Sequence, residues 1–307
     1  MDDYRAQLFP YLSSSRITTL SCGHVIPPSN LFVRPLSKTY DGKDFDFTFS
    51  SRNSSSMITS LGESLIELMR SIPDGAVIFF PSYSYLEHVL ATWKQSTDSK
   101  APIFSRLEVV KPVFLDVQTG NNTSTTDEIL ASYTAAVNDP PSSSPHRGAL
   151  LLSVIGGKLS EGINFSDRLG RCVMVIGLPY PNPNSAEWKA KMEYIERKAK
   201  ERSSSKNDRD EAMRQTERKV QYMAGQASRE FADNVCMRAV NQAIGRAVRH
   251  KDDWAAILLV DRRYEQKRIK DKLPKWIKES MQEVSPAGER NFAYTMNDLG
   301  GFYREKG

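Results

Sequence analysis

Short apolar runs without polar alternation recur along this chain of 307 residues. Buried strands of a parallel sheet have this composition, because helices cover both faces of such a sheet. Another segment, residues 44–49, alternates polar and apolar positions and predicts a half-exposed strand. The runs that predict buried strands are residues 77–80, 112–115, 149–154, 172–177 and 255–261.

Helical periodicity separates several of these runs. Apolar residues at helical spacing over 58–72 predict one helix, and residues 83–94 predict a second helix behind the first strand. Residues 127–137 predict a third helix, with Thr126 as its N-cap. Strands that alternate with helices predict an α/β domain with a mostly parallel sheet.

Charged residues concentrate in residues 187–219, which hold 11 Lys and Arg against 8 Asp and Glu. This composition predicts a charged helical arm, interrupted by a mobile insert at residues 203–208. A solvated arm is the simpler interpretation, and an arm that faces nucleic acid is the alternative.

Composition excludes several classes of protein. No stretch approaches the roughly 18 consecutive apolar residues of a membrane-spanning helix, so no membrane partner is expected. The first residues lack the apolar segment of a secretory signal. Three distant cysteines (Cys22, Cys172 and Cys236) argue against a disulfide scaffold, a structural zinc site or a complete cysteine-ligated cluster within this chain. The net charge of +5 is compatible with an anionic partner.

Polar and glycine-rich residues follow four of the predicted strands. Parallel strands end at one edge of a sheet, and ligands bind at that edge. Gly156 and Gly157 permit backbone amides to converge on an anion, although a plain strand-to-helix turn would also favour glycine. Lys158 does not complete the GxxxxGK[ST] phosphate loop. The polar continuations are Ser82 and Tyr83, residues 156–165, residues 178–183 and residues 262–264.

Residues 241–250 carry the most specific pattern. On a helix, Gln242, Arg246 and Arg249 would leave one face, opposite the apolar residues. Two arginines and an amide aimed together suit a polyphosphate, whereas a surface that makes salt bridges is the alternative. Gly245 inside a helix would cost about 1 kcal/mol relative to alanine, which a close packing partner would explain.

Together these segments resemble the second RecA-like motor domain of XPD-like, iron–sulfur superfamily 2 DNA helicases. The resemblance runs from residue 21 to residue 277. Residues 21–28, the Gly156–Gly157 pair and Asn164, where many relatives carry Asp, point to the branch that acts in sister-chromatid cohesion. The matching segments are residues 242–250 for motif VI, 157–165 for motif V, 79–83 for motif IV, and 259–264 and 273–277 for the carboxyl-terminal signatures.

The resemblance implies a RecA-like helicase domain 2 over residues 21–285, which includes the charged arm. Residues 1–20 are expected to lead in from a first motor lobe, and residues 286–307 to form a C-terminal tail. The Walker A loop, acidic box and four-cysteine cluster of a first lobe do not occur in this sequence. We therefore expect the chain to be the carboxyl-terminal part of a longer motor.

The resemblance also assigns roles to residues. ATP and Mg²⁺ would be held mainly by the first lobe, which would also carry a 4Fe–4S cluster. Arg246 and Arg249 would act as arginine fingers, and Gln242 would orient the attacking water or bind the γ-phosphate. Contacts to nucleotide are implied for Glu161, Gly162, Asn164 and Gly245. Contacts to one DNA strand are implied for Ser82, Tyr83, Lys158, Ser160 and Arg263.

The implied function is the carboxyl-terminal lobe of a nuclear, ATP-dependent 5′-to-3′ DNA helicase of cohesion and DNA repair. Its implied partners are single-stranded or forked DNA, the first motor lobe, and replication-fork and cohesion factors. Two alternatives remain open: a nucleic-acid-binding module without catalysis, and a RecA-like scaffold that docks other proteins.

Overall fold

The computed structural model describes residues 9, 12–18, 20, 25–95, 100–116, 125–139, 148–162, 164–204, 213–281 and 292–306. These residues form two compact units. Unit 1 comprises Met1–His24 with Tyr180–Cys236, and unit 2 comprises Val25–Pro179 with Met237–Gly307. Residues 21–24 and 205–208, which carry parts of the predicted branch signature and insert, lie outside the described residues. A search of the described helices finds none with both the length and the apolar character to cross a membrane.

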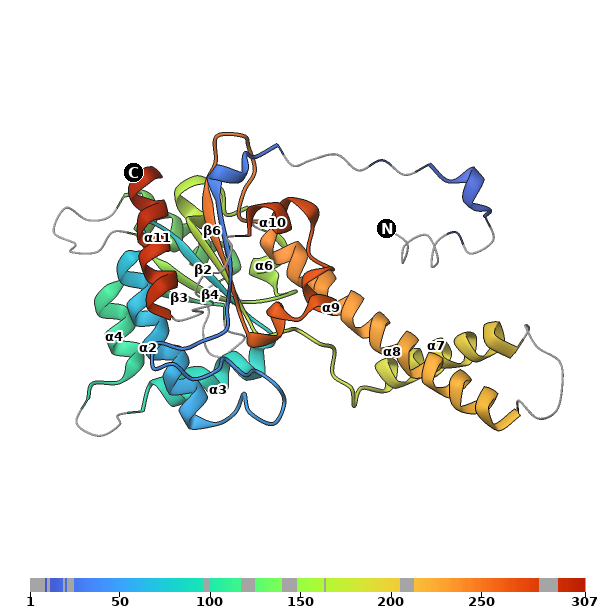
Figure 1. The fold of residues 1–307 in the computed structure, drawn as a ribbon. Helices are drawn as coiled ribbons and strands as arrows, with labels where there is room; N and C mark the ends of the chain where they lie inside the picture. The colour runs from blue at the N-terminus through green and yellow to red at the C-terminus, as the bar shows by residue number, and fades with distance from the viewer. Residues whose placement is uncertain are drawn as a thin grey trace. The chain divides into compact units, whose positions relative to one another are not determined.

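A six-stranded sheet forms the centre of unit 2 (Figure 1). The strand order is β1-β6-β5-β2-β4-β3, and every neighbouring pair is parallel. Every residue of β2, β4, β5 and β6 is buried, as the apolar runs predict. The α/β fold with a parallel sheet is thereby confirmed. The strands are β1 (Leu31–Leu36), β2 (Ala76–Phe80), β3 (Val113–Leu115), β4 (Leu150–Val154), β5 (Cys172–Ile176) and β6 (Ala255–Val260).

Helices pack on both faces of this sheet. One apolar core joins one face to four helices, which lie to the left of the sheet and below it in Figure 1. They are α2 (Ser55–Ser71), α3 (Tyr83–Trp93), α4 (Ile103–Val110) and α11 (Phe292–Lys306). Rings on the other face contact Tyr133 and Phe165. The remaining helices of unit 2 are α5 (Thr126–Asn138), α6 (Lys158–Gly162), the end of α8 (Met213–Ile244), α9 (Lys267–Lys270), α10 (Lys275–Ser280) and the 3₁₀ turns η2 (Pro28–Asn30), η3 (Asp167–Gly170) and η4 (Arg262–Glu265).

The predicted strand at residues 44–49 is wrong. These residues are all described, and they form a loop with one isolated bridge between Lys38 and Asp44. Phe45 and Phe47 are buried and their rings stack 5.8 Å apart, whereas Phe49 is exposed. The alternation is therefore real, but it anchors a loop rather than pairing a strand.

The predicted N-cap of α5 is displaced by one residue. The backbone N–H of Glu128 donates to the Thr125 hydroxyl at 3.3 Å, and the Thr125 N–H donates to the Glu128 carboxylate at 2.8 Å. This reciprocal capping box makes Thr125 the cap and Thr126 the first helical residue.

Unit 1 contains the charged arm as a pair of helices, α7 (Ala186–Ser204) and the amino-terminal part of α8. It also contains the short 3₁₀ turn η1 (Ser14–Arg16). The rings of Trp188 and Phe231 lie 5.9 Å apart and join the two helices. The Ser228 hydroxyl donates to Glu196 at 3.1 Å. The unit extends beyond the predicted arm at both ends, because its arm segment runs from Tyr180 to Cys236.

The expected tail at residues 286–307 contains an integral helix. Leu299 of α11 is fully buried, and Phe302 and Tyr303 pack in the same core as α2 and β1. Asp298 binds Arg34 of β1 at 2.7 Å. The segment therefore belongs to unit 2, because its apolar residues recur at helical spacing and complete that core.

We expect Leu299→Ala to lower the free energy of unfolding by about 2–5 kcal/mol, because it leaves a cavity under α11. Urea unfolding of the purified chain measures this loss. Asn297→Ala changes an exposed position of the same helix and serves as the control. Equal midpoints for the two variants would show that α11 does not stabilise the core.

Candidate functional site

A buried carboxylate lies where β3 ends. The Ser153 hydroxyl on β4 donates to Asp116 Oδ2 at 2.8 Å, and the Tyr83 hydroxyl at the start of α3 donates to Asp116 Oδ1 at 3.3 Å. Burial raises the pKa of the Asp116 carboxyl, although both hydroxyl hydrogen bonds oppose that rise. Asp116 therefore ties together the carboxyl edge at β2, β3 and β4.

The glycine pair passes directly beside this carboxylate. A Cβ on Gly157 would lie 2.4 Å from the Tyr83 hydroxyl oxygen and 3.1 Å from Asp116 Oδ2. Gly156 has a φ of +72°, which favours glycine in a turn. Turn geometry thus explains Gly156, whereas close packing against the Asp116 cluster explains Gly157.

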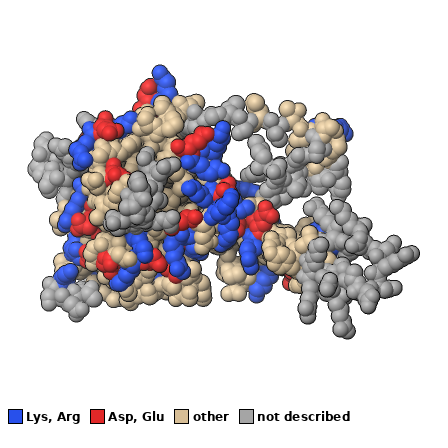
Figure 2. Space-filling view, in the orientation of Figure 1, with Lys and Arg blue, Asp and Glu red and all other residues tan. Residues whose placement is uncertain are grey.

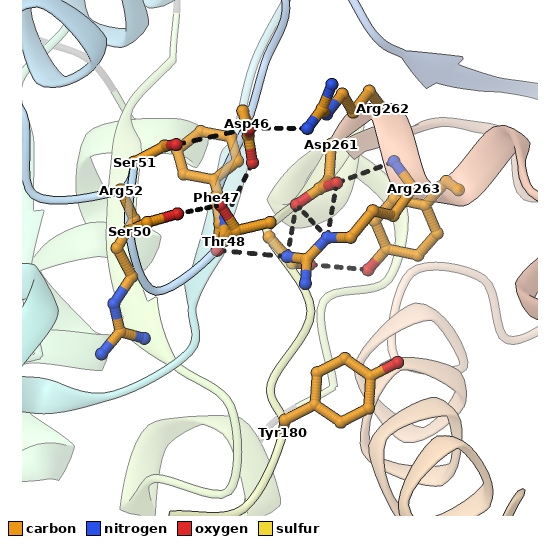
Figure 3. A network of polar contacts seen from close by, with 12 residues as sticks. Asp46, Phe47, Thr48, Ser50, Ser51, Arg52, Tyr180, Asp261, Arg262 and Arg263 are labelled. Carbon is orange, nitrogen blue, oxygen red and sulfur yellow. Dashed lines mark hydrogen bonds and ion pairs between the residues drawn. The ribbon is translucent and has the colours of Figure 1, made fainter. Parts of the chain in front are cut away.

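A second buried carboxylate lies after β6 (Figure 3). Arg263 Nη2 donates to Asp261 Oδ2 at 2.7 Å, and Arg263 Nε donates to Asp261 Oδ1 at 2.9 Å. The same guanidinium donates to the Phe47 carbonyl at 3.1 Å. Beside it, Arg262 Nη2 binds Asp46 at 2.7 Å. These ion pairs fasten the loop at residues 44–49 to the carboxyl edge of the sheet.

The predicted helix over residues 241–250 is wrong beyond Ile244, where α8 ends. The Arg246 N–H donates to the Ala243 carbonyl at 3.2 Å, so the last turn tightens into 3₁₀ geometry. A Cβ on Gly245 would meet only the Asn241 and Gln242 carbonyls among the described residues. The expected packing partner is therefore not found, and the shared helical face does not exist.

Arg246 and Arg249 nevertheless meet the segment that follows α6. The Phe165 N–H donates to the Arg246 carbonyl at 3.2 Å, and Arg249 Nη2 donates to Asn164 Oδ1. Arg246 is half-buried, whereas Arg249 and Gln242 are exposed. Nowhere in the described structure does a carboxylate pair with the Arg246 or Arg249 guanidinium. This arrangement favours an anionic ligand over the surface salt bridges considered above.

Asp167, His250 and Asp253 bring three ligand atoms within 4.8 Å of one another. Both Asp253 oxygens already accept hydrogen bonds, Oδ1 from Arg171 at 2.9 Å and Oδ2 from the Asp167 N–H at 3.3 Å. The arginine partner neutralises the buried carboxylate, so the group suits an ion-paired structural link better than a metal centre.

A family model described as the helicase C-terminal domain matches residues 65–280. The chain belongs to this helicase C-terminal domain family. The match confirms the family that the motifs predict. Among relatives, "ATP-dependent DNA helicase chl1" of Aspergillus clavatus is 48% identical over 310 residues, which cover 100% of this chain and 40% of that protein. "ATP-dependent DNA helicase CHL1" of Coccidioides immitis is 47% identical and covered to 33%.

The chain thus spans 40% or less of the length of these two relatives. A solved structure titled "XPD_Helicase" has 19% sequence identity and a TM-score of 0.48, over 83% of this chain and 35% of that one.

Within this helicase domain, the structure brings the predicted residues Asn164 and Arg249 into contact. The Tyr83 hydroxyl lies beside Gly157, which precedes the exposed Lys158. Ser160 is buried, and its hydroxyl donates to the Gly157 carbonyl at 2.8 Å.

The other predicted residues have local roles or lie partly outside the description. Ser82 caps α3 by accepting from the Tyr85 N–H at 3.2 Å, and Arg263 holds Asp261. Glu161 and Gly162 complete α6, and the Glu161 side chain lies outside the described part of the structure. Their nucleotide and DNA roles stay predictions.

Sequence reasoning missed Asp116 and Asp261, the two buried carboxylates of the edge. Asp116 directly follows the predicted strand at residues 112–115. The rule that polar residues after parallel strands lie at the ligand-binding edge therefore applies to Asp116 as it does to Ser82. The last predicted strand, residues 255–261, includes Asp261, whereas β6 ends one residue earlier.

Asp116→Asn tests the raised pKa of the buried carboxyl. With a folded pKa above the ordinary value of about 3.9, the stability from Asp116 is fully present below that value and is lost as pH rises through the folded pKa. Lowering the pH from about 7 to about 4.5 should therefore stabilise the wild type relative to the variant. Urea unfolding at several pH values measures this difference. A difference that is constant or of opposite sign would contradict the raised pKa.

Proposed function

We propose that this chain is the carboxyl-terminal motor lobe of an ATP-dependent DNA helicase. The observation that carries the proposal is that Arg249 binds Asn164 and the Arg246 carbonyl accepts from Phe165, while neither guanidinium has a carboxylate partner in the described structure. Guanidinium groups of this kind stabilise negative charge on a transferring phosphoryl group. The helicase C-terminal domain match and the printed names of the relatives support the same function.

The residues present fit an ATP phosphate chain. Arg246 and Arg249 neutralise charge that develops on the γ-phosphoryl group, and the exposed Gln242 orients the attacking water. Asn164 accepts from Arg249 and holds its guanidinium in place. Mg²⁺, held mainly by the first lobe, would neutralise charge on the phosphate oxygens. Glu161, Gly162 and Gly245 complete the proposed nucleotide contacts.

The DNA strand would follow the carboxyl edge of the sheet. Lys158 is exposed there, and the amino end of α3 offers the backbone amides next to Ser82 and Tyr83. Ser160 and Arg263 lie at the same edge of the sheet, and local hydrogen bonds hold both side chains in place. They would contact the strand from these fixed positions. Opening and closing of two lobes around ATP would move the protein 5′-to-3′ along the strand.

Further parts of the proposal rest on the family resemblance alone. They are a 4Fe–4S cluster in the first lobe, a nuclear location, and a role in sister-chromatid cohesion and DNA repair. Single-stranded or forked DNA, the first lobe, and replication-fork and cohesion factors are the proposed partners.

Reconstitution tests the motor function. The chain alone should hydrolyse no ATP above background, because its sequence has no GxxxxGK[ST] phosphate loop. Mixing the chain with a separately expressed amino-terminal motor lobe should yield ATP hydrolysis that single-stranded DNA stimulates. Turnover by the chain alone, or an inert mixture of two folded lobes, would refute the assignment and favour a non-catalytic module.

Arg246→Ala and Arg249→Ala should each reduce kcat of the two-lobe motor by roughly 10³- to 10⁵-fold. Neither change opens a core cavity, since Arg246 is half-buried and Arg249 is exposed. Lysine should restore little turnover, because its point charge does not reproduce the planar guanidinium. Steady-state ATPase assays measure kcat, with Arg70→Ala as a control at an arginine paired with Glu67. Near-wild-type turnover of Arg246→Ala would remove the arginine-finger role.

A further inference from the structure

The loop before α2 presents an exposed aromatic ring at the carboxyl edge of the sheet. Phe49 is 82% exposed, the largest fraction among the large apolar side chains of the described residues. Its neighbours in the alternating pattern, Phe45 and Phe47, are fully or almost fully buried. The core therefore accounts for those two rings but not for the Phe49 ring, which lies outside it.

A rigid turn holds this ring in place. The Arg52 N–H donates to the Thr48 carbonyl at 2.9 Å, and the Thr48 N–H donates to Asp46 Oδ1 at 3.0 Å. Arg262 and Arg263 fasten the preceding loop residues to the end of β6. The Tyr85 hydroxyl donates to the Arg52 carbonyl at 3.0 Å and fastens the other end of the turn to α3. The turn is thus organised before any ligand arrives.

Arg52 lies between two aromatic rings. Its guanidinium carbon is 5.5 Å from the centroid of Phe49 and 5.5 Å from that of Tyr85. Arg52 Nε is buried and finds no acceptor among the described residues. In Figure 3 the Arg52 guanidinium points away from the Asp46 and Asp261 carboxylates. The Arg52 guanidinium and the exposed Phe49 ring therefore lie together, and the guanidinium has at least one N–H group without an acceptor.

The surrounding charge favours an anionic chain. Residues 48–56 contain five serines and no carboxylate, so the turn offers hydroxyl groups without electrostatic repulsion. Residues 262–278, which start at the arginines that fasten this loop, hold eight Lys and Arg against two Asp and Glu. Figure 2 shows blue side chains gathered over the region where α9 and α10 lie in Figure 1.

We propose that Phe49 and Arg52 form a binding site for single-stranded nucleic acid, in which Phe49 stacks on a base and Arg52 binds the adjacent phosphate. Base stacking on an aromatic ring beside a cation is the usual way to bind single strands without reading sequence. The proposal rests on the proposed helicase function and extends its strand path from Ser82 and Tyr83 to the loop before α2.

Titration of the 307-residue chain with fluorescein-labelled dT20 tests this site. Phe49→Ala should weaken binding roughly 5- to 150-fold, which corresponds to the loss of one stacked base. Arg52→Ala should weaken binding and reduce the log–log salt slope by about 0.7, the value for one phosphate on a single strand. Phe49→Trp should retain affinity, and its added indole fluorescence should be quenched by dT20.

Val109→Ala is the matched control, because Val109 is 74% exposed on α4, which leads into the amino end of β3 at the opposite edge. Equal dT20 affinity for wild type, Phe49→Ala and Arg52→Ala would overturn this site and leave the motor function standing. A wild-type chain that does not bind dT20 would overturn both the site and the proposed strand path. Failed ATPase reconstitution, with dT20 binding still weakened by Phe49→Ala, would remove the motor function alone.

Discussion

The parallel pairing of strands that are buried on both faces constrains the rest of this molecule. The residues of β2, β4, β5 and β6 are all buried, so no side chain along these strands can meet a ligand. Parallel strands also end at the same edge, which leaves that edge as the natural place for polar chemistry. Asp116, Gly157 and Asp261 all lie just past strand ends, as this constraint requires.

Two buried carboxylates then organise the edge in different ways. Asp261 is neutralised by the Arg263 guanidinium, which also holds the Phe47 carbonyl, so the pair locks a loop in place. Asp116 has hydroxyl partners instead of a bound cation, and burial raises its pKa. A buried charge without a full counter-charge is costly to the fold. Asp116 packs directly beside the Gly156–Gly157 loop, so we infer that its role is to position this loop.

Sequence predicted the elements that depend on local pattern and missed those that depend on a partner. Five of the six strands follow from apolar runs alone, whereas β1 was missed because Arg34 and Pro35 interrupt its run. Arg34 is tolerated there because Asp298 of α11 binds it, and α11 was itself expected as a tail. β1 and α11 therefore depend on each other through this ion pair, and the sequence of either segment alone does not predict its place in the core. The proline also fits the position of β1 at the edge of the sheet.

The candidate site shows the same division. The motifs single out Arg246, Arg249 and Asn164 separately, and the fold brings Arg249 into contact with Asn164, although the helical face invoked for the arginines does not exist beyond Ile244. The sequence does not reveal which arginines of unit 2 bind carboxylates and which do not. Arg34, Arg106, Arg171 and Arg263 bind carboxylates and hold the fold together. Arg52, Arg246 and Arg249 have only neutral partners among the described residues, namely rings, an amide and backbone groups. Because no carboxylate among the described residues binds Arg52, Arg246 or Arg249, these three guanidinium groups are available for anions that come from outside the chain.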